Sequence, residues 1–463
     1  MASEGPSQEP PKSTRKRKRT LEEVIAELPS LESIQYTPLR PIPREPQLNP
    51  PSDLDIESRY ALFSLFFTED ILETISHSTN AYAKRQRMKF EDSIIQPRAW
   101  KDTSQQRSRS FLENGPIHLP QLYMTQTRFE QLKRFLHVSN VNNEELKPPG
   151  SKDWWYKLGP LASSFHEAAQ RYYIPGPNLS VDEVMVRCAG QSLHTYKMPH
   201  KPIKQGYKVF SLAEHGYIWT FSWSSRQIGR EEMFKQPELT PTGSIVVEMI
   251  NRLPKFSHSS ERESPSTLSD RSISQAGLEV AITSPIASYS IYMDNYFSSV
   301  ALFNYLYDHQ YGACGTARPS PGIPSLLQAL REHAKSLPWG TLYALPVSNV
   351  LCLSWHDNNI VLGLSALHSA DGFVSCKRRR PGKTSTNGAI ARRVFGGEVI
   401  KELDIPLFIY DSNHYMNGVD LTNQYRASYE VHLKGYRNWL PLLYFFINAA
   451  IVNAYRVQYI YYV

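Results

Sequence analysis

The stretch from Leu179 to Val186, Leu-Ser-Val-Asp-Glu-Val-Met-Val, sets two acidic residues inside a run that is typical of a buried β-strand. A carboxylate in a dry interior is costly unless a basic side chain or a metal ion accompanies it. Asp182 and Glu183 are adjacent, so on a strand their side chains point to opposite faces. Only one can serve a given site, and we take Asp182 as the candidate ligand. This geometry disfavours a glycosidase, whose two carboxylates face each other across about 5–10 Å.

The size and charge of the chain set the class of protein. Its 463 residues are enough for two or three domains, each with its own core. The chain carries 51 Lys and Arg against 44 Asp and Glu, a net charge of +7 that is consistent with a polyanionic partner. It has four cysteines and no CxxC pair, so we expect no zinc module and no disulfide framework, and we favour a reducing compartment. The N-terminus has no apolar segment typical of a secretory signal.

Residues 1–55 are rich in Pro, Ser and charge, which predicts a disordered tail. The tail contains a compact basic run made of Arg15, Lys16, Arg17, Lys18 and Arg19. Such a run is a solvated tail, a phosphate contact or a nuclear import signal. Because the run lies in an accessible segment, we favour import and predict a nuclear protein.

Residues 56–165 are predicted to form a mainly helical domain. The clearest helix begins near Thr125, where Phe129, Leu132 and Phe135 recur with the spacing of one apolar face. Basic residues on the same helix are most simply a solvated face.

Residues 166–320 are predicted to begin with a sheet. After the strand that carries Asp182, residues 206–212 and 217–221 read as two further strands joined by a turn at His215 and Gly216. This pattern predicts an antiparallel β-meander.

A second acidic strand follows a predicted helix at residues 244–253. It spans residues 290–295 and ends at Asp294, and another helix and a strand at 311–316 come next. Strand, helix and strand in this order predict that the sheet becomes parallel here. The carboxyl end of such a strand is where open α/β sheets place ligands, so Asp294 is a second candidate.

Residues 321–400 are predicted to form a β-rich insertion subdomain. Residues 350–355 and 360–364 read as a hairpin turned at Asp357 and Asn358. A basic loop follows, and no acidic residue occurs from Cys376 to Gly397, so we favour phosphate binding over a solvated loop. The basic residues of this loop are Lys377, Arg378, Arg379, Arg380 and Lys383.

Residues 401–463 are predicted to be C-terminal helices of the core. Asp420 is either an ordinary helix N-cap or a third acidic ligand. The run from Trp439 to Ala454 is apolar enough to suggest a membrane span, but Pro441, Asn448 and Asn453 interrupt it. We therefore predict a core helix and no membrane association.

Asp182, Asp294 and Asp420 together suggest a site. A meander, a helix, an acid-ended strand, an insertion and an acid on a late helix follow one another, which is the layout of a ribonuclease-H-like core of the α/β class. Two Mg²⁺ (or Mn²⁺) ions about 3.5–4 Å apart need anionic oxygen ligands of this kind.

The chain also resembles the piggyBac transposase family over short motifs that run in order from about residue 61 to the C-terminus. The motifs are Phe66–Thr68, Thr79–Ala83, Arg128–His137, Leu179–Glu183, Lys201–Lys208, Met293–Ser299, Gly315–Arg318, Trp355–Asp357, Tyr415–Asp420 and Asn453–Tyr455. The resemblance implies a cut-and-paste transposase that acts on double-stranded DNA with a TTAA target preference. It also implies an N-terminal dimerisation and DNA-binding domain, hence a homodimer, and an insertion domain.

The resemblance implies that the three catalytic and metal-binding aspartates fall on Asp182, Asp294 and Asp420. In such an enzyme Lys201, Lys204 and Lys208, with the basic loop, would contact DNA phosphates.

Two departures keep an alternative open. Family members often carry a further acid three residues after the third catalytic one, where this chain has Asn423, and a neutral amide there weakens the local negative field. Many relatives end in a cysteine-rich module, whereas no cysteine follows Cys376 here. The alternative is a domesticated or decayed nuclear DNA-binding protein without catalytic turnover.

Overall fold

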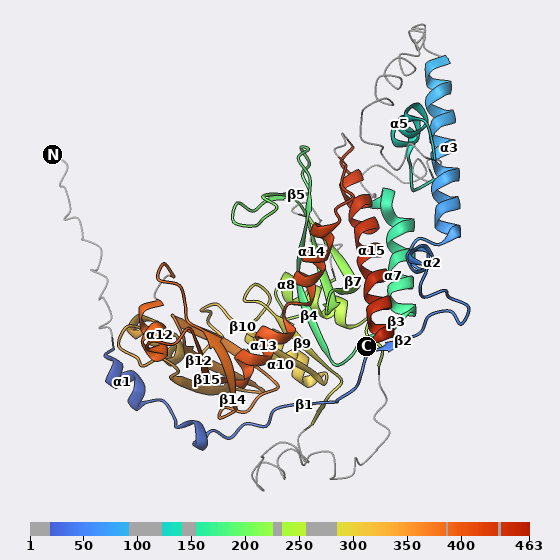
Figure 1. Ribbon diagram of the computed structural model, residues 1–463. Helices are drawn as coiled ribbons and strands as arrows, with labels where there is room; N and C mark the ends of the chain where they lie inside the picture. The colour runs from blue at the N-terminus through green and yellow to red at the C-terminus, as the bar shows by residue number, and fades with distance from the viewer. Residues whose placement is uncertain are drawn as a thin grey trace, which may run out of the picture. The chain divides into compact units, whose positions relative to one another are not determined.

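The structure, a computed structural model, describes residues 19–91, 123–140, 154–225, 234–255, 285–385, 388–433 and 437–463 (Figure 1). The chain divides into two compact units. Unit 1 comprises the described residues within Met1–Arg40, Ser269–Ala287 and Ser298–Ser412. Unit 2 comprises those within Pro41–Leu268, Ser288–Phe297 and Asn413–Val463. Each unit therefore joins segments that are distant in sequence, whereas the predicted boundaries at 55, 165, 320 and 400 divide the chain into consecutive blocks.

The described part of unit 2 is built on a mixed sheet. Its strands are β4 (Asn178–Arg187), β5 (Thr195–Lys197), β6 (Gln205–Glu214), β7 (Tyr217–Ser224) and β9 (Tyr289–Met293). Strand β6 pairs antiparallel with β4, β5 and β7, and β9 pairs parallel with β4. The predicted meander and the parallel strand that follows it are both confirmed. A separate short pair joins β2 (Gln47–Leu48) to β3 (Tyr173–Ile174).

The turn between β6 and β7 shows why the meander forms where the sequence predicts it. His215 and Gly216 both have positive φ, 45° and 95°, the left-handed conformation that glycine adopts most easily. A Cβ at Gly216 would also lie 2.8 Å from the ring of Tyr425. The flanking strands are almost wholly buried, so the turn is fixed by both backbone geometry and packing.

Helices complete unit 2. They are α2 (Arg59–Ser64), α3 (Glu69–Glu91), α5 (Gln126–Phe135), the 3₁₀ turn η3 (Tyr156–Leu158), α7 (Gly159–Arg171), α8 (Pro241–Ile250), α14 (Gly418–Ser428) and α15 (Leu440–Tyr462). Helix α5 forms where the sequence predicts it, although none of its residues is fully buried. Helices α7 and α15 lie side by side (Figure 1), with the rings of Phe165 and Phe446 at 5.7 Å.

Helix α15 is long and apolar enough to cross a membrane, but 83% of its apolar window is buried inside the protein. Its two asparagines explain how a polar residue fits there. Asn453 exchanges two hydrogen bonds of 2.9 Å with the backbone of Ile218, and Asn448 Oδ1 accepts one of 3.1 Å from the N–H of Val431. Paired in this way, they are compatible with burial. The prediction of a core helix agrees with this packing.

Unit 1 contains four antiparallel strands. They are β10 (Tyr311–Thr316), β11 (Leu342–Val347), β12 (Val350–His356) and β13 (Ile360–Ser365), in the order β11-β12-β13-β10. The predicted hairpin at Asp357 and Asn358 is confirmed, because His356 pairs with Ile360. The helices are α10 (Val300–Asp308), α11 (Ser325–Ala329), η5 (Leu330–His333), α12 (Gly388–Phe395) and α13 (Leu407–Tyr415), which ends beyond the unit boundary.

The prediction of a basic loop after this hairpin is wrong for three of its five residues, whereas Arg380 and Lys383 lie beyond the strand. Lys377, Arg378 and Arg379 lie on a strand, β14 (Phe373–Arg379), which pairs antiparallel with β15 (Ile400–Pro406). Glu402 stands opposite Lys377, so the acidic residues missing nearby in sequence are supplied by the partner strand. The composition of residues 376–397 gave no sign of this pairing.

The predicted disordered tail also extends too far. Residues 1–18 lie outside the described residues, but from residue 19 onward the chain is ordered: α1 (Leu21–Ala26), η1 (Leu31–Ser33) and β1 (Arg40–Pro41), which pairs with β8 (Ile286–Ala287). Thr20 and Glu23 form the expected capping box on α1. Val24 and Leu39 are buried, and this apolar packing offsets the high Pro and Ser content that suggested disorder.

Candidate functional site

Two of the predicted acidic residues belong to neighbouring strands of unit 2: Asp182 lies on β4, and Asp294 directly follows β9. In the parallel pairing of β4 with β9, Val181 stands opposite Met293, so Asp182 and Asp294 are the next residues at equivalent positions. Neighbouring strands are about 4.8 Å apart, and equivalent positions direct their side chains to the same face. Asp182 and Asp294 are both half-buried. The sheet therefore brings these two carboxylates to one place.

The third acidic residue is carried by a helix that is fastened to β4. The N–H of Val419 donates to Ser180 Oγ at 3.1 Å, and that hydroxyl donates to the carbonyl of Ala213. Ser180 lies two residues before Asp182 and shares its face of the strand. A Cβ at Gly418 would lie 2.5 Å from Ser180 Oγ, so the close approach of α14 requires glycine. This anchor holds the first turn of α14, which contains Asp420, against the strand of Asp182.

Asp420 itself is exposed and is not the N-cap of the helix, which is one of the two roles that the sequence allows. The cap is Asn417, and its side chain makes no capping hydrogen bond. Asp420 is the third residue of the first turn, where a negative charge is favoured by the helix dipole. Its side chain is thus available to a ligand.

The charges of the site act on one another. Burial, then the neighbouring charge of Glu183 and that of Asp294, raise the pKa of Asp182 to about 7. Partial burial alone would lower the pKa of Lys201, but Glu183, Asp182 and Asp420 together raise it. The charge of Asp294 thus shifts the pKa of Asp182, and the charges of Asp182 and Asp420 shift the pKa of Lys201. All three aspartates therefore belong to one electrostatic cluster.

Asp182 and Asp294 are better placed to bind a divalent cation together than all three aspartates are. Asp182 and Asp294 offer hard oxygen donors side by side, the ligand type that Mg²⁺ and Mn²⁺ prefer. Within the described ranges, however, no three or more His, Cys, Asp and Glu side chains lie together as a ready ligand cluster. Asp182 and Asp294 would hold the ion, and Asp420 would join them from the first turn of α14.

The three lysines predicted to contact DNA differ in exposure. Lys204 is exposed, and Lys201 is half-exposed with its ammonium 3.1 Å from Glu183 Oε1. Lys208 is only 4% exposed and lies opposite Met185 in the β4–β6 pairing, which turns its side chain to the face of Glu183. A buried ammonium cannot reach a phosphate, so the prediction of Lys208 as a DNA contact is wrong.

Strand alternation also sorts the basic residues of β14. Lys377 and Arg379 are exposed, and Lys383 beyond the strand is exposed too. Arg378 points the other way, with Nη2 3.0 Å from Asp357 Oδ2, and Arg380 donates to the carbonyl of Gly396. Those two guanidinium groups are engaged within unit 1. Their partners are distant in sequence, so no local pattern identified them.

The predicted nuclear import run can be followed only at its end. Arg15, Lys16, Arg17 and Lys18 lie outside the described residues. Arg19 forms an exposed ion pair of 2.9 Å with Glu27.

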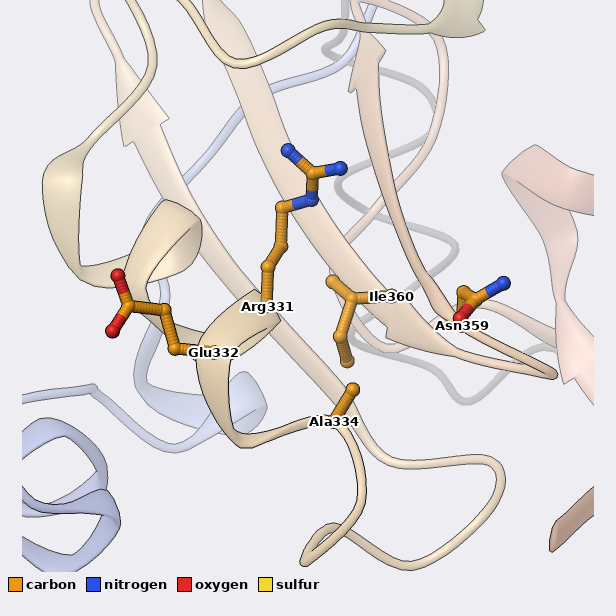
Figure 2. Close-up of a pocket in the computed structure, with 5 residues that line it drawn as sticks. All are labelled: Arg331, Glu332, Ala334, Asn359 and Ile360. Atoms are coloured by element: carbon orange, nitrogen blue, oxygen red, sulfur yellow. The ribbon is translucent and has the colours of Figure 1, made fainter. Parts of the chain in front are cut away.

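A pocket of about 470 Å³ on unit 1 contains none of the predicted residues (Figure 2). The lining residues are Arg331, Glu332, Ala334, Asn359 and Ile360. Figure 2 shows the side chains of Arg331 and Glu332 pointing apart. A ligand site needs polar groups that converge, and this pocket lacks such an arrangement.

Comparison with known proteins gives consistent results. The model of a family described as "Transposase IS4" matches residues 58–259 and 265–455. The human protein "PiggyBac transposable element-derived protein 2" is 23% identical over 419 residues, which cover 87% of this chain and 61% of the relative. The human "PiggyBac transposable element-derived protein 3" is 23% identical over 437 residues, 88% of this chain and 63% of the relative. The chain thus spans about three fifths of the length of these relatives.

A solved structure shares the fold. It is a cryo-EM structure of a piggyBac transposase synaptic complex with hairpin DNA. The TM-score is 0.60 and the sequence identity is 19%, over 89% of this chain and 77% of that chain. The resemblance found in the sequence motifs is confirmed by the family match, the curated relatives and this structural match.

Proposed function

Since this chain belongs to the Transposase IS4 family and is of the piggyBac type, we propose that it is a cut-and-paste DNA transposase with Asp182, Asp294 and Asp420 as its catalytic residues. One observation carries the proposal. Asp182 on β4 and Asp294, directly after the parallel strand β9, stand at equivalent positions, and Ser180 fastens the turn that contains Asp420 to β4. The proposed reaction is cleavage of double-stranded DNA followed by joining of the free 3′-hydroxyl to a TTAA target.

We propose a ribonuclease-H-like core for unit 2. Three antiparallel strands in the order β7-β6-β4 support it, followed by helix α8 and then by β9 parallel to β4. The predicted role of residues 56–165 as a dimerisation and DNA-binding domain is part of the same proposal, and so is a homodimer.

We propose Mg²⁺ or Mn²⁺ as the cofactor. A bound divalent ion would activate a water or a 3′-hydroxyl and stabilise the leaving oxygen of a phosphodiester. The protein's own contribution is orientation. Asp182 Oδ1 accepts a hydrogen bond of 2.7 Å from the N–H of Glu183, and Asp294 Oδ1 accepts one of 2.8 Å from the N–H of Tyr296.

The proposed DNA contacts are the basic residues whose side chains reach solvent. They are Lys201, Lys204, Lys377, Arg379 and Lys383. Contacts of this type give an affinity that falls steeply with salt and does not depend on sequence. The synaptic complex of the related solved structure, which contains hairpin DNA, supports DNA as the partner here. A nuclear location, through the basic run at Arg15–Arg19, belongs to the proposal as well.

The second candidate is a transposase-derived DNA-binding protein without turnover. Asn423, where relatives often carry an acid, favours it: its Oδ1 accepts a hydrogen bond of 3.2 Å from Arg426 and adds no negative charge to α14. The human relatives are described as transposable element-derived proteins.

A nicking assay separates the two. Purified protein is incubated with supercoiled plasmid in buffer that contains either Mg²⁺ or Mn²⁺ at a millimolar concentration. The Asp294→Asn variant, treated in the same way, is the matched control. Transposase function predicts metal-dependent nicking by the wild type and none by Asp294→Asn. Equal background nicking by both proteins, together with salt-sensitive DNA binding, would leave the second candidate.

A further inference from the structure

Lys208 is a buried cation in the middle of a central strand. It lies on β6 and is 4% exposed, and burial lowers the pKa of its ammonium. An ammonium in such a place is strongly unfavourable unless its surroundings compensate the charge. The side chains around this ammonium therefore indicate the role of Lys208.

Three neighbouring side chains compensate the charge. The ammonium lies 3.8 Å from Glu183 Oε2, an ion-pair distance too long for a hydrogen bond. It also lies over the ring of Tyr296, 3.9 Å from the centroid, and 4.8 Å from that of Phe210. A cation over an aromatic face is stabilised by the ring quadrupole, and more so when it is desolvated. Lys208 thus connects β4 to the turn that follows β9.

Two of these neighbours, Glu183 and Tyr296, also hold the aspartates. The N–H of Glu183 donates to Asp182 Oδ1 at 2.7 Å. The N–H of Tyr296 donates to Asp294 Oδ1 at 2.8 Å. Each aspartate is therefore oriented by a backbone N–H of a residue whose side chain touches the ammonium of Lys208.

We propose that Lys208 is a positioning residue that fixes the orientation of Asp182 and Asp294 relative to each other through Glu183 and Tyr296. The inference rests on the proposed function only for what the two carboxylates do. Catalytic groups must be held close to their productive geometry, and a shift of about 1 Å reduces rates by about 10²-fold. Lys208 would act through these two neighbours, because its own ammonium is buried against Glu183 and Tyr296.

A simpler role for Lys208 is to neutralise Glu183. Lys208→Met alone would not distinguish the roles, because it leaves a buried carboxylate with only Lys201 beside it. The double variant Lys208→Met with Glu183→Gln removes both charges and keeps similar volumes, so folding is preserved while the contact with Tyr296 is lost. Tyr296→Leu removes the ring but keeps the ion pair, and Tyr296 is 39% exposed, so this change spares the core. Lys197→Met, at an exposed lysine of β5 that is not among the proposed DNA contacts, is the matched control.

The first readout is hydrogen–deuterium exchange of metal-free protein, which needs no activity. The positioning role predicts that exchange of the Tyr296 amide accelerates about ten-fold in the double variant and in Tyr296→Leu. It predicts no change at the Tyr296 amide in Lys197→Met, and no change in helix α7 in any variant. Wild-type exchange at Tyr296 in both variants, or acceleration spread evenly over unit 2, would overturn the inference.

The second readout is metal-dependent nicking. Because the positioning role concerns geometry, the double variant should keep its DNA affinity and lose about 10²-fold in nicking rate. Wild-type rates in the double variant would overturn the inference. If the wild-type protein does not nick at all, the proposed function fails, while the exchange experiment still decides the role of Lys208.

Discussion

The acidic face of β4 and the basic strand β14 are organised by the same rule, with opposite results. On each, like charges stand next to one another in sequence, and the two-residue repeat of a strand separates them. On β4, Asp182 faces the site and Glu183 faces the lysines. On β14, Lys377 is exposed and Arg378 is bonded to Asp357. On each of these two strands, consecutive charged residues therefore point to opposite faces. Those on one face stabilise the fold, and those on the other are available to a ligand.

Among substitutions that test this comparison, we expect the largest effect on the acidic face of β4. Asp182→Asn should reduce metal-dependent nicking by about 10³-fold or more, because a carboxylate that acts together with others cannot be replaced singly. The rate is measured on supercoiled plasmid under single-turnover conditions. Circular dichroism and DNA affinity should match the wild type. A loss below ten-fold would remove Asp182 from the site.

The anchor of α14 gives the next largest effect. Gly418→Ala places a methyl group 2.5 Å from Ser180 Oγ and 2.9 Å from the carbonyl of Ala213, so it should lower stability by about 1–3 kcal/mol and displace Asp420. Urea unfolding measures the change. Gly159→Ala is the matched control, since nothing lies within 4 Å of its added Cβ and it begins α7. Equal stability of the two variants would refute the close approach.

A buried carboxylate on β6, Glu214, gives a pH-dependent effect of similar size, and its pKa is raised by burial and not by a neighbouring negative charge. Burial raises the pKa of Glu214 from 4.5 to about 7, while the hydroxyl of Tyr173 and the N–H of Gly176 oppose the shift. A carboxyl with a raised folded pKa stabilises the fold below pH 4.5, and this contribution is lost as the pH rises to about 7. Unfolding free energy should therefore fall across this window by about 1–3 kcal/mol in the wild type.

Glu214→Gln should flatten that dependence. The control is Glu167→Gln at an exposed site on α7, which should keep the wild-type slope. Identical slopes in wild type and Glu214→Gln would show that this carboxyl is not the cause.

The smallest effects are expected on β14. They test whether its exposed basic residues contact DNA while the residue between them stabilises unit 1. Lys377→Ala with Arg379→Ala should leave stability unchanged and reduce the slope of log affinity for DNA against log salt by about 2. Arg378→Ala should leave the slope unchanged and destabilise unit 1 by about 0.5–1 kcal/mol, because its ion pair is partly exposed. Fluorescence anisotropy over a salt series and thermal unfolding provide the measurements. If Arg378→Ala lowered the salt dependence and the Lys377→Ala, Arg379→Ala variant lowered stability, the comparison of β14 with β4 would be wrong.

The sequence predicts those parts of the site that depend on local pattern. The strand of Asp182, the turn at His215 and Gly216, and the acid at the end of β9 all carry signals within a few residues. It does not predict features set by distant pairing. The burial of Lys208 depends on its register with β4, and the conversion of the basic loop into a strand depends on β15, which lies beyond α12. Side-chain character alone cannot reveal which face a paired strand turns inward.

The bond from Val419 to Ser180 spans 239 residues, and the longest segment of unit 1 is translated between its two ends. A nascent chain must therefore wait for the C-terminal helices before α14 can dock and α15 can cover the apolar strands of unit 2. Closing so long a loop is entropically unfavourable and slow, and it leaves hydrophobic surface open to misassembly. We expect chaperone assistance during biosynthesis, and refolding in vitro whose yield falls as the protein concentration rises.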